Sequence, residues 1–240
     1  MMRKTLISIL CLVACAFHSM TYATDFASKV NTLIGTDYTG NTYPGAQVPF
    51  GMVQLSPDNG LPGWDRIAGY FYPDSTIAGF SHTHLLGTGA GDLYDISFLP
   101  VTLPYNEAEE PLGIHSRFTH KDETAHAGYY QVRLTDYDIN VELTATPRCG
   151  VQRYTFPNDG KERMVILDLN KAMNWDATVD SKINVVDSFT IEGYRYSDGW
   201  ARNQRVWFRT RFLFFFKSLE IESKKLQNNP NGVGCIARFK

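Results

Sequence analysis

The stretch GYYQVRLTDYDINVELTATPRCGVQRYTFP, residues 128–157, decides the fold class. Apolar residues occupy every second position in two of its runs: Val132 and Leu134, then Ile139, Val141 and Leu143. This alternation is typical of a strand with one buried face, and the TDYD between the runs is typical of a hairpin turn. The stretch therefore predicts antiparallel strands.

The same pattern extends over most of the chain. Strand-length runs separated by Pro, Gly and Asp turns occupy residues 47–58, 68–85, 95–104, 163–169, 182–200 and 205–212. The one predicted helix is short, from residue 25 to residue 33, with Asp25 as its N-cap. We therefore expect an all-β protein, an antiparallel β-sandwich.

Composition excludes some classes of protein. Hydrophobic residues make up 43% and charged residues 20%, a balance that is typical of a folded domain. The formal net charge of -2 gives no electrostatic signature for binding nucleic acid. Aromatic residues reach 13%, which suits both a β-sheet core and the binding of sugars.

The N-terminus predicts an export signal, residues 1–23. MMRKT supplies a basic region, and LISILCLVACAF is an apolar run too short for a transmembrane span. Cleavage after Ala23 and a lipobox ending at Cys15 both remain open. Either one predicts a bacterial protein that leaves the cytoplasm, as a periplasmic protein or an outer-membrane lipoprotein.

Beyond the signal, we expect the sandwich over residues 24–222 and an atypical tail over residues 223–240. The tail loses strand character, which we interpret as a truncation or a shifted reading frame. Cys149 is expected to be a buried strand residue, because the two cysteines outside the signal do not make a disulfide framework or a metal motif.

The segment GFSHTHLLGTGAGDLYD, residues 79–95, is the first candidate site. A strand would point His82 and His84 to one face, where zinc or copper could bind with a further ligand such as Asp92 or Asp95. The pair could instead be structural, or could bind a polar ligand. The glycines do not form a phosphate loop, because no lysine or helix start follows. We predict no metal here.

A second candidate is PGWDRIAGY, in which Trp64 is followed by Asp65 and Arg66. An indole beside charged hydrogen-bonding groups can stack on a sugar ring while the charges bind hydroxyls. The alternative is a tryptophan at the edge of the core. The glycine-rich segment that contains Gly40 is a third candidate, as a binding loop or as a connection between strands.

Three blocks of the chain together resemble the N-terminal domain of glycoside hydrolase family 92, the exo-acting α-mannosidases. They are VNTLIGTDYTGNTYPGAQVPFGMVQLSPD, GWDRIAGYFYPDSTIAGFSHTHLLGTGAGDLYDISFLP and the opening stretch. The resemblance extends from about residue 30 to residue 212. It implies an N-terminal β-sandwich followed in the same protein by an (α/α)6 barrel. It also implies calcium-dependent, inverting hydrolysis of terminal α-linked mannose, α-1,2 in particular, on N-glycans or mannan.

The resemblance also implies which part of the enzyme this chain supplies. The catalytic acid, the base and the calcium ligands belong to the barrel, so we expect no catalytic residue and no bound calcium in this chain, and no activity alone. Its expected substrate-binding residues are Gly40, Trp64, Asp65, Arg66, His82 and His84. Two alternatives remain open: a stand-alone carbohydrate-binding sandwich and an exported metal-binding protein.

Overall fold

The computed structural model describes residues 25–104, 106, 108, 112–222 and 232–239. The chain divides into two compact units, Met1–Val30 and Asn31–Lys240. The predicted export signal lies outside the described residues. No helix in the described ranges is long and apolar enough to cross a membrane.

The helix predicted over residues 25–33 is much shorter. Among residues 25–30, the described part of the first unit, the 3-10 helix η1 (Ala27–Lys29) forms, and it ends where Val30 becomes extended. The Asp25 carboxylate accepts a hydrogen bond from the Ser28 backbone at 3.2 Å. A nine-residue segment is below the length at which a helix is stable without tertiary packing, so a single turn results.

The second unit contains a central seven-stranded antiparallel sheet. Its strand order is β1-β2-β4-β5-β11-β16-β15. The strands are β1 (Ala46–Gln47), β2 (Gln54–Asp58), β4 (Gly79–Ser81), β5 (Ser97–Val101), β11 (Arg163–Asp168), β16 (Gly234–Phe239) and β15 (Ser218–Glu222).

Smaller sheets and two 3-10 helices complete the unit. A four-stranded sheet has the order β10-β9-β8-β7, a three-stranded sheet the order β12-β13-β14, and β3 pairs with β6. The elements are η2 (Trp64–Arg66), β3 (Thr76–Ile77), β6 (Ser116–Arg117), η3 (His120–Asp122), β7 (Glu123–His126), β8 (Tyr129–Leu134), β9 (Ile139–Ala145), β10 (Gly150–Thr155), β12 (Ala177–Asp187), β13 (Thr190–Asp198) and β14 (Gln204–Arg211).

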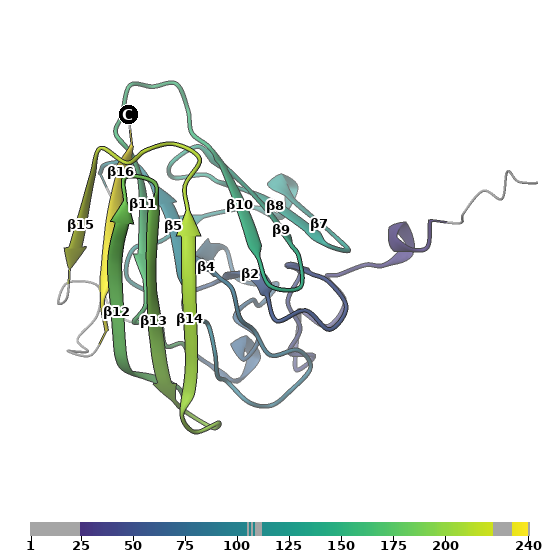
Figure 1. Ribbon diagram of the computed structural model, residues 1–240. Coiled ribbons are helices and arrows are strands. Elements are labelled where there is room, and N and C mark those ends of the chain that lie inside the picture. Colours follow the sequence, from purple (N-terminus) through teal and green to yellow (C-terminus); the bar gives the residue numbers. More distant parts are fainter. Residues whose placement is uncertain (1–24, 105, 107, 109–111, 223–231, 240) are drawn as a thin grey trace, which may run out of the picture. The chain divides into compact units, whose positions relative to one another are not determined.

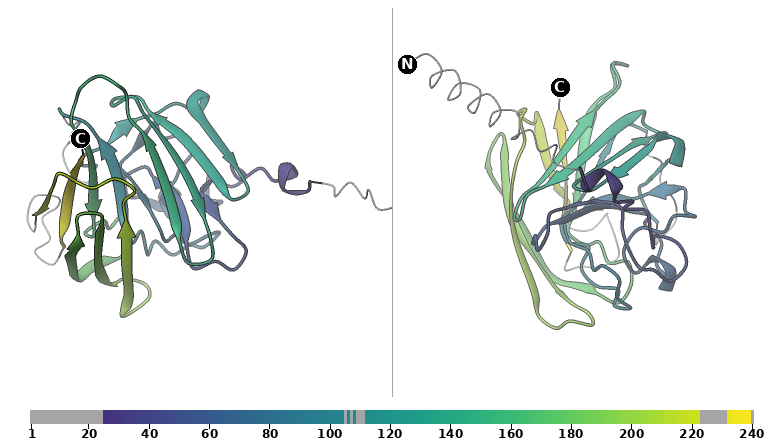
Figure 2. Two further views of the ribbon diagram at one scale, coloured as in Figure 1. Left: turned by 45° about the horizontal axis from the view of Figure 1, so that its top comes forward. Right: turned by 90° about the vertical axis from the view of Figure 1, so that its right-hand side faces the viewer.

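Two hydrophobic cores lie on opposite faces of the central sheet. Leu99 and Ile166 join the core shared with β8 and β9, whereas Phe98 and Leu167 join the core shared with β12 and β13. Adjacent residues point to opposite faces because side chains alternate along a strand. The result is three layers of sheet, with β7 to β10 on one side of the central sheet and β12 to β14 on the other (Figures 1 and 2). The predicted antiparallel β-sandwich is confirmed.

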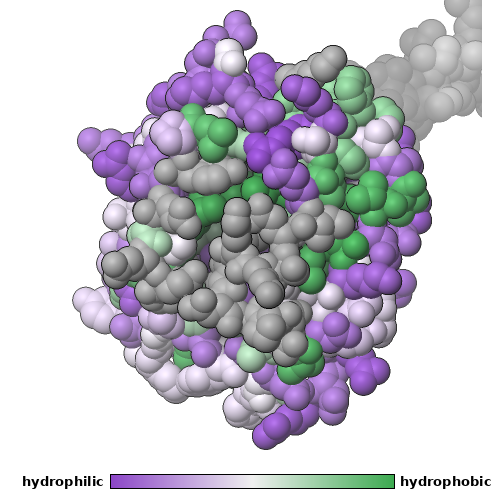
Figure 3. Space-filling model, turned by 90° about the vertical axis from the view of Figure 1, so that its left-hand side faces the viewer, coloured by the Kyte–Doolittle hydropathy of each residue, from purple (hydrophilic) through white to green (hydrophobic). Residues whose placement is uncertain are grey.

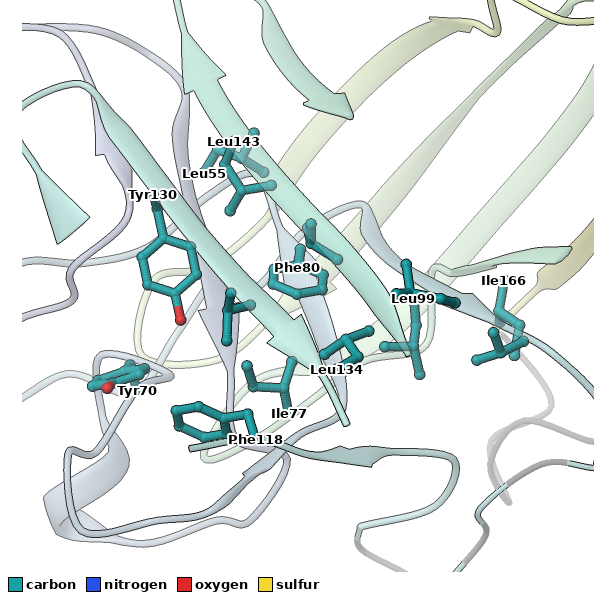
Figure 4. Packing of buried hydrophobic residues seen from close by; sticks show 14 of the residues in the cluster. Leu55, Tyr70, Ile77, Phe80, Leu99, Phe118, Tyr130, Leu134, Leu143 and Ile166 are labelled. Carbon is teal, nitrogen blue, oxygen red and sulfur yellow. The ribbon is translucent and has the colours of Figure 1, made fainter. Parts of the chain in front are cut away.

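The first core explains why the opening stretch is informative. Val132 and Leu134 of β8 and Ile139, Val141 and Leu143 of β9 are all buried in it. Figure 4 shows Leu134 and Leu143 pointing at Leu55, Phe80 and Leu99 of the central sheet. The alternating positions are the inward face of the four-stranded sheet.

Two expectations are corrected. Residues 234–239 of the predicted tail form β16, which pairs with β11 on one side and β15 on the other, so the sandwich continues past residue 222. Cys235 and Ile236 face different cores, and a strand buried on both faces has no polar alternation that would reveal it. Cys149 is exposed in the turn between β9 and β10, where its backbone N–H donates to Thr146 Oγ1 at 3.1 Å. The interpretation of the tail as a truncation or frame shift remains a prediction.

Candidate functional site

The two histidines of the first candidate segment follow β4 and bind different partners. The backbone remains extended past the strand: the His82 N–H donates to the Asp95 carbonyl at 2.9 Å. The Tyr94 N–H donates to the Thr83 carbonyl at 3.0 Å. The glycine-rich loop between Thr83 and Tyr94 is therefore closed at its base by backbone pairing.

His84 is a buried brace. Its Nε2 lies 2.9 Å from Asp58 Oδ1, and its Nδ1 lies 2.7 Å from the Gln54 carbonyl oxygen. Neither the His84 nor the Asp58 side chain is exposed. Both ring nitrogens of His84 therefore have hydrogen-bond partners inside the protein.

His82 lies beside the second core. Its Nδ1 donates to the Ile96 carbonyl at 2.8 Å, and its ring meets Phe98 edge-on at 5.6 Å. Burial lowers the pKa of His82 to about 4, so the ring is neutral at pH 7. Within the described ranges, no group of three His, Cys, Asp or Glu side chains is placed to hold a metal ion.

The two aspartates after the glycines tie the loop to β13 and β14. Asp95 Oδ1 accepts from Arg195 Nη1 at 2.6 Å, and Arg195 Nη2 donates to Asp176 at 2.5 Å. Burial raises the pKa of Asp176 to about 6, against the opposing effect of Arg195. Asp92 accepts from the backbone N–H groups of Trp200 and Ala201 at 2.9 and 2.6 Å.

These contacts hold a strained backbone. Leu93, Tyr94 and Ile96 have φ angles of 86°, 63° and 57°, in the left-handed region that non-glycine residues rarely adopt. Each such residue costs on the order of 1–3 kcal/mol and persists only where its surroundings impose it. Strain of this kind gathers at functional sites, so the loop is a candidate site on backbone geometry as well.

Two exposed tryptophans lie beside this loop. Trp64 of η2 is 56% exposed and Trp175 is 47% exposed, with ring centroids 5.9 Å apart. A Cβ atom added at Gly89 would lie 3.3 Å from the Trp64 ring, so the glycine-rich loop contacts the indole. The Trp175 N–H donates to the Gly91 carbonyl at 3.1 Å.

Asn174 holds the tryptophan pair in place. Its Oδ1 accepts from the Gly63 N–H at 3.0 Å, directly before η2. Its Nδ2 lies 3.1 Å from Tyr94 Oη and 3.3 Å from the Arg66 carbonyl. One amide thus fastens η2, the strained segment and the Trp175 loop together, and the rings are presented by a rigid base.

Among the predicted site residues next to Trp64, Asp65 and Arg66 differ. Asp65 is exposed. Arg66 forms a two-point ion pair with Asp74, at 2.6 and 2.5 Å, and its guanidinium lies 5.0 Å from the Phe71 ring centroid. The Arg66 guanidinium therefore stabilises the turn after η2.

Gly40 belongs to a neighbouring loop. A Cβ atom at Gly40 would lie 2.2 Å from the Gly35 carbonyl oxygen, so only glycine allows this close approach. The next residue, Asn41, accepts a hydrogen bond from Gly87 N at 2.6 Å. The structure therefore brings the Gly40 and Trp64 loops to the glycine-rich loop, while His82 and His84 brace its base.

Sequence reasoning missed Trp175 and Asn174. Both lie in KAMNWD, residues 171–176, after the buried strand β11. A tryptophan beside polar residues directly after a buried strand was the available signal.

The comparisons with known proteins agree with one family. A model described as the glycosyl hydrolase family 92 N-terminal domain matches residues 29–240. The family GH92 α-mannosidase of Bacteroides thetaiotaomicron in complex with mannoimidazole is 33% identical with a TM-score of 0.79, over 88% of this chain and 30% of that one. An inverting mannosidase of the same family from Bacteroides thetaiotaomicron VPI-5482 shares the fold at 24% identity and a TM-score of 0.74, over 92% of this chain and 30% of that one.

A curated relative extends the match beyond bacteria. An uncharacterized secreted glycosidase of Arthroderma benhamiae is 26% identical over 163 residues, which are 62% of this chain and 20% of that protein. This chain therefore spans a fifth of that relative and about a third of the solved ones. The family model covers most of the chain, including β16. The chain belongs to glycosyl hydrolase family 92 and is an N-terminal domain of that family.

Proposed function

We propose that this chain is the sugar-facing N-terminal domain of an exported, inverting α-mannosidase. The observation that carries the proposal is the exposed pair Trp64 and Trp175, held by Asn174 on a strained and buried network. Rigid aromatic rings beside an exposed carboxylate can stack on a pyranose and bind its hydroxyls. The solved relative bound to mannoimidazole supports mannose as the sugar.

In this proposal the predicted site residues have two roles. Trp64 and Asp65 contact the sugar together with Trp175, and Gly40 shapes the adjoining loop. Arg66, His82 and His84 position those loops through Asp74, the Ile96 carbonyl and Asp58.

The hydrolytic step belongs to the part of the protein outside this chain. Inversion needs one carboxyl group that protonates the leaving oxygen and one that activates water. Near the tryptophan pair, the Asp92 and Asp95 carboxylates are taken by backbone amides and by Arg195. We therefore propose that this chain supplies binding and positioning, and that a catalytic barrel in the same protein supplies acid and base.

Calcium is proposed to bind elsewhere in the protein. No group of three candidate side chains in the described part of the chain can hold a metal ion, and carboxylate ligands are what calcium prefers. We propose that the calcium of the family is held outside this chain. The α-1,2 linkage and N-glycans or mannan as substrates are proposed from the family resemblance.

The secreted relative supports export, and the periplasm or the outer membrane is the proposed location. The stand-alone carbohydrate-binding alternative is favoured by the same tryptophan pair. The metal-binding alternative has no specific support, because His82 and His84 use their nitrogens for separate structural partners.

The test joins this chain to the catalytic part of a family relative and uses an α-mannobiose as substrate. Trp64→Ala should lower kcat/KM about tenfold to a hundredfold, mostly through KM, because stacking acts in the ground state and the transition state alike. Phe26→Ala, which removes an exposed ring elsewhere, is the control. His82→Ala should leave the metal content unchanged. Wild-type kinetics for Trp64→Ala, with loss of a stoichiometric metal ion from His82→Ala, would overturn the proposal.

A further inference from the structure

The outer face of the three-stranded sheet presents a grid of nine polar and aromatic side chains. The opposite face carries Ile183, Ile191 and Phe208 in the second core, so alternate residues point outward. The strand register places them in three rows across β12, β13 and β14: Asp180, Tyr196 and Arg205; Lys182, Tyr194 and Trp207; Asn184, Glu192 and Arg209. Figure 1 shows this sheet as a separate layer with its strands side by side.

The aromatic residues of the grid support one another. Tyr194 and Tyr196 stack with centroids 4.5 Å apart, and the Arg205 guanidinium lies 5.1 Å from the Tyr196 ring centroid. Trp207 meets Tyr196 edge-on at 5.5 Å and an interplanar angle of 72°, and it is 63% exposed. Tyr196 is thus covered by its neighbours, while the Trp207 indole is fixed at its edge and remains accessible to solvent.

The charges of the grid nearly cancel. Lys182, Arg205 and Arg209 oppose Asp180 and Glu192. Arg209 pairs with Glu192 at 3.1 Å, and Tyr194 Oη donates to Asp180 at 3.1 Å. A phosphate-rich polymer needs a strong excess of positive charge, and the three cations of this face exceed its two carboxylates by only one.

The composition also argues against a protein partner. Five of the nine side chains are charged and none is aliphatic, whereas the centre of a protein interface is depleted in charge. An accessible indole surrounded by hydrogen-bond donors and acceptors suits a neutral polyhydroxylated ring, whose apolar face stacks and whose hydroxyls exchange hydrogen bonds.

We propose that the outer face of β12, β13 and β14 is a second glycan-binding surface, at which Trp207 stacks on a pyranose and the Glu192–Arg209 pair binds its hydroxyls. The inference rests on the proposed function for the ligand class, a mannose-rich polysaccharide or branched glycan. It is independent of that function in its residues, since Trp64 and Trp175 lie on other segments. One arm of a glycan held at Trp207 would raise the local concentration of its other arms around the protein.

The test measures binding of a soluble neutral α-mannan to the full chain by affinity gel electrophoresis. Trp207→Ala should weaken binding about fivefold, and Trp207→Phe should retain most of it because a ring remains. Phe26→Ala, which removes an exposed ring outside the grid, should bind like the wild type. Thermal unfolding of each variant checks that the sheet is intact.

The outcomes separate this inference from the proposed function. Weakening by Trp207→Ala in both the wild-type and the Trp64→Ala background supports the second surface, whatever Trp64→Ala does alone. Loss of all mannan binding in Trp64→Ala, with no effect of Trp207→Ala, overturns the inference and leaves the proposed function standing. Absence of mannan binding by the wild type also overturns it. So does a change of oligomeric state in Trp207→Ala without a change in mannan binding, because the face would then join two copies of the chain.

Discussion

Arg195 and Asp95, 100 positions apart in the chain, form an ion pair of 2.6 Å in which neither side chain is exposed. The other guanidinium nitrogen binds Asp176, and Arg195 Nη1 also donates to the Leu93 carbonyl at 3.2 Å. The arginine therefore joins β13 to the strained segment that supports the tryptophan pair.

Removing this arginine should destabilise the protein strongly. Arg195→Met leaves two buried carboxylates without their cation, and we expect the free energy of unfolding to fall by about 3–5 kcal/mol in urea titrations. Arg209→Met breaks an exposed ion pair of the same sheet and should cost less than about 1 kcal/mol. Equal losses in the two variants would show that the buried pair is not a central support of the fold.

The histidine beside the second core should make stability depend on pH. The pKa of His82 falls from 6.5 to about 4 on folding, so the unfolded chain binds more protons between these values. Its contribution is complete above about pH 6.5 and is lost as the pH falls toward 4. We expect the urea midpoint of His82→Asn, which keeps a donor for the Ile96 carbonyl, to fall less from pH 7 to pH 5 than that of the wild type.

The raised pKa of Asp176 acts in the opposite direction over about pH 4 to 6. Because Asp176 is unchanged in His82→Asn, the difference between the two proteins isolates the histidine. Parallel pH profiles would contradict the assignment of a buried, neutral His82.

The asparagine beneath the tryptophan pair should affect binding without contacting sugar. Asn174→Ala removes the acceptor for the Gly63 N–H and frees η2 to move. In the fusion of this chain to the catalytic part of a family relative, we expect KM to rise by several-fold while kcat changes less. The reason is that the substitution displaces Trp64 and leaves the catalytic groups in place. Exposed Asn158→Ala is the matched control. If Asn174→Ala and Asn158→Ala have the same kinetics, Asn174 does not position the site.

The chain by itself should not release mannose. The Asp92 and Asp95 carboxylates near the tryptophan pair are occupied, and the exposed Asp65 alone cannot supply both the acid and the base that inversion needs. We therefore expect no turnover of an α-mannobiose by the purified chain in the presence of calcium. The contrary result would be mannose release in proportion to the amount of protein, with no release from a Trp64→Ala preparation purified in parallel. It would show that the catalytic groups lie in this chain.

The purified chain should also associate with itself. In the run of five residues from Phe212 to Phe216, the two end residues pack on the second core, whereas Leu213, Phe214 and Phe215 are exposed. Figure 3, viewed from the side on which β15 lies, shows hydrophobic areas among the hydrophilic surface. Exposed aromatic segments without charge promote association. We expect Phe214→Ser to lower the apparent mass of the wild type at high concentration, as measured by light scattering, and a monomeric wild type would contradict this.

The strands that were easiest to predict belong to sheets with one buried and one solvent-exposed face. In β8 and β9 the inward residues alternate with polar ones, so the sequence itself shows an apolar residue at every second position. In β16 both faces are buried, and the four letters GCIA contain no alternation to recognise. The same physics that places this strand inside the sheet removes its signature from the sequence.

The site was predictable only in part for a similar reason. Trp64 stands out because an indole beside charges is unusual in a turn. That Arg66 pairs with Asp74, and that His84 pairs with Asp58, depends on side chains that meet only after folding. The left-handed φ angles of Leu93, Tyr94 and Ile96 have no counterpart in residue type, since none of the three is a glycine.

The position of β16 has a consequence for the order in which the protein is made. Within the described residues, β15 pairs with no strand other than β16. β11 pairs with β5 along one edge and with β16 along the other, so this second edge also stays unpaired until β16 is present. During synthesis, neither edge can be satisfied until Gly234–Phe239 has left the ribosome. The nascent domain therefore exposes two open sheet edges until almost all of these 240 residues have been translated. Through that interval its completion depends on slow, long-range pairing, and the open edges can be bound by chaperones.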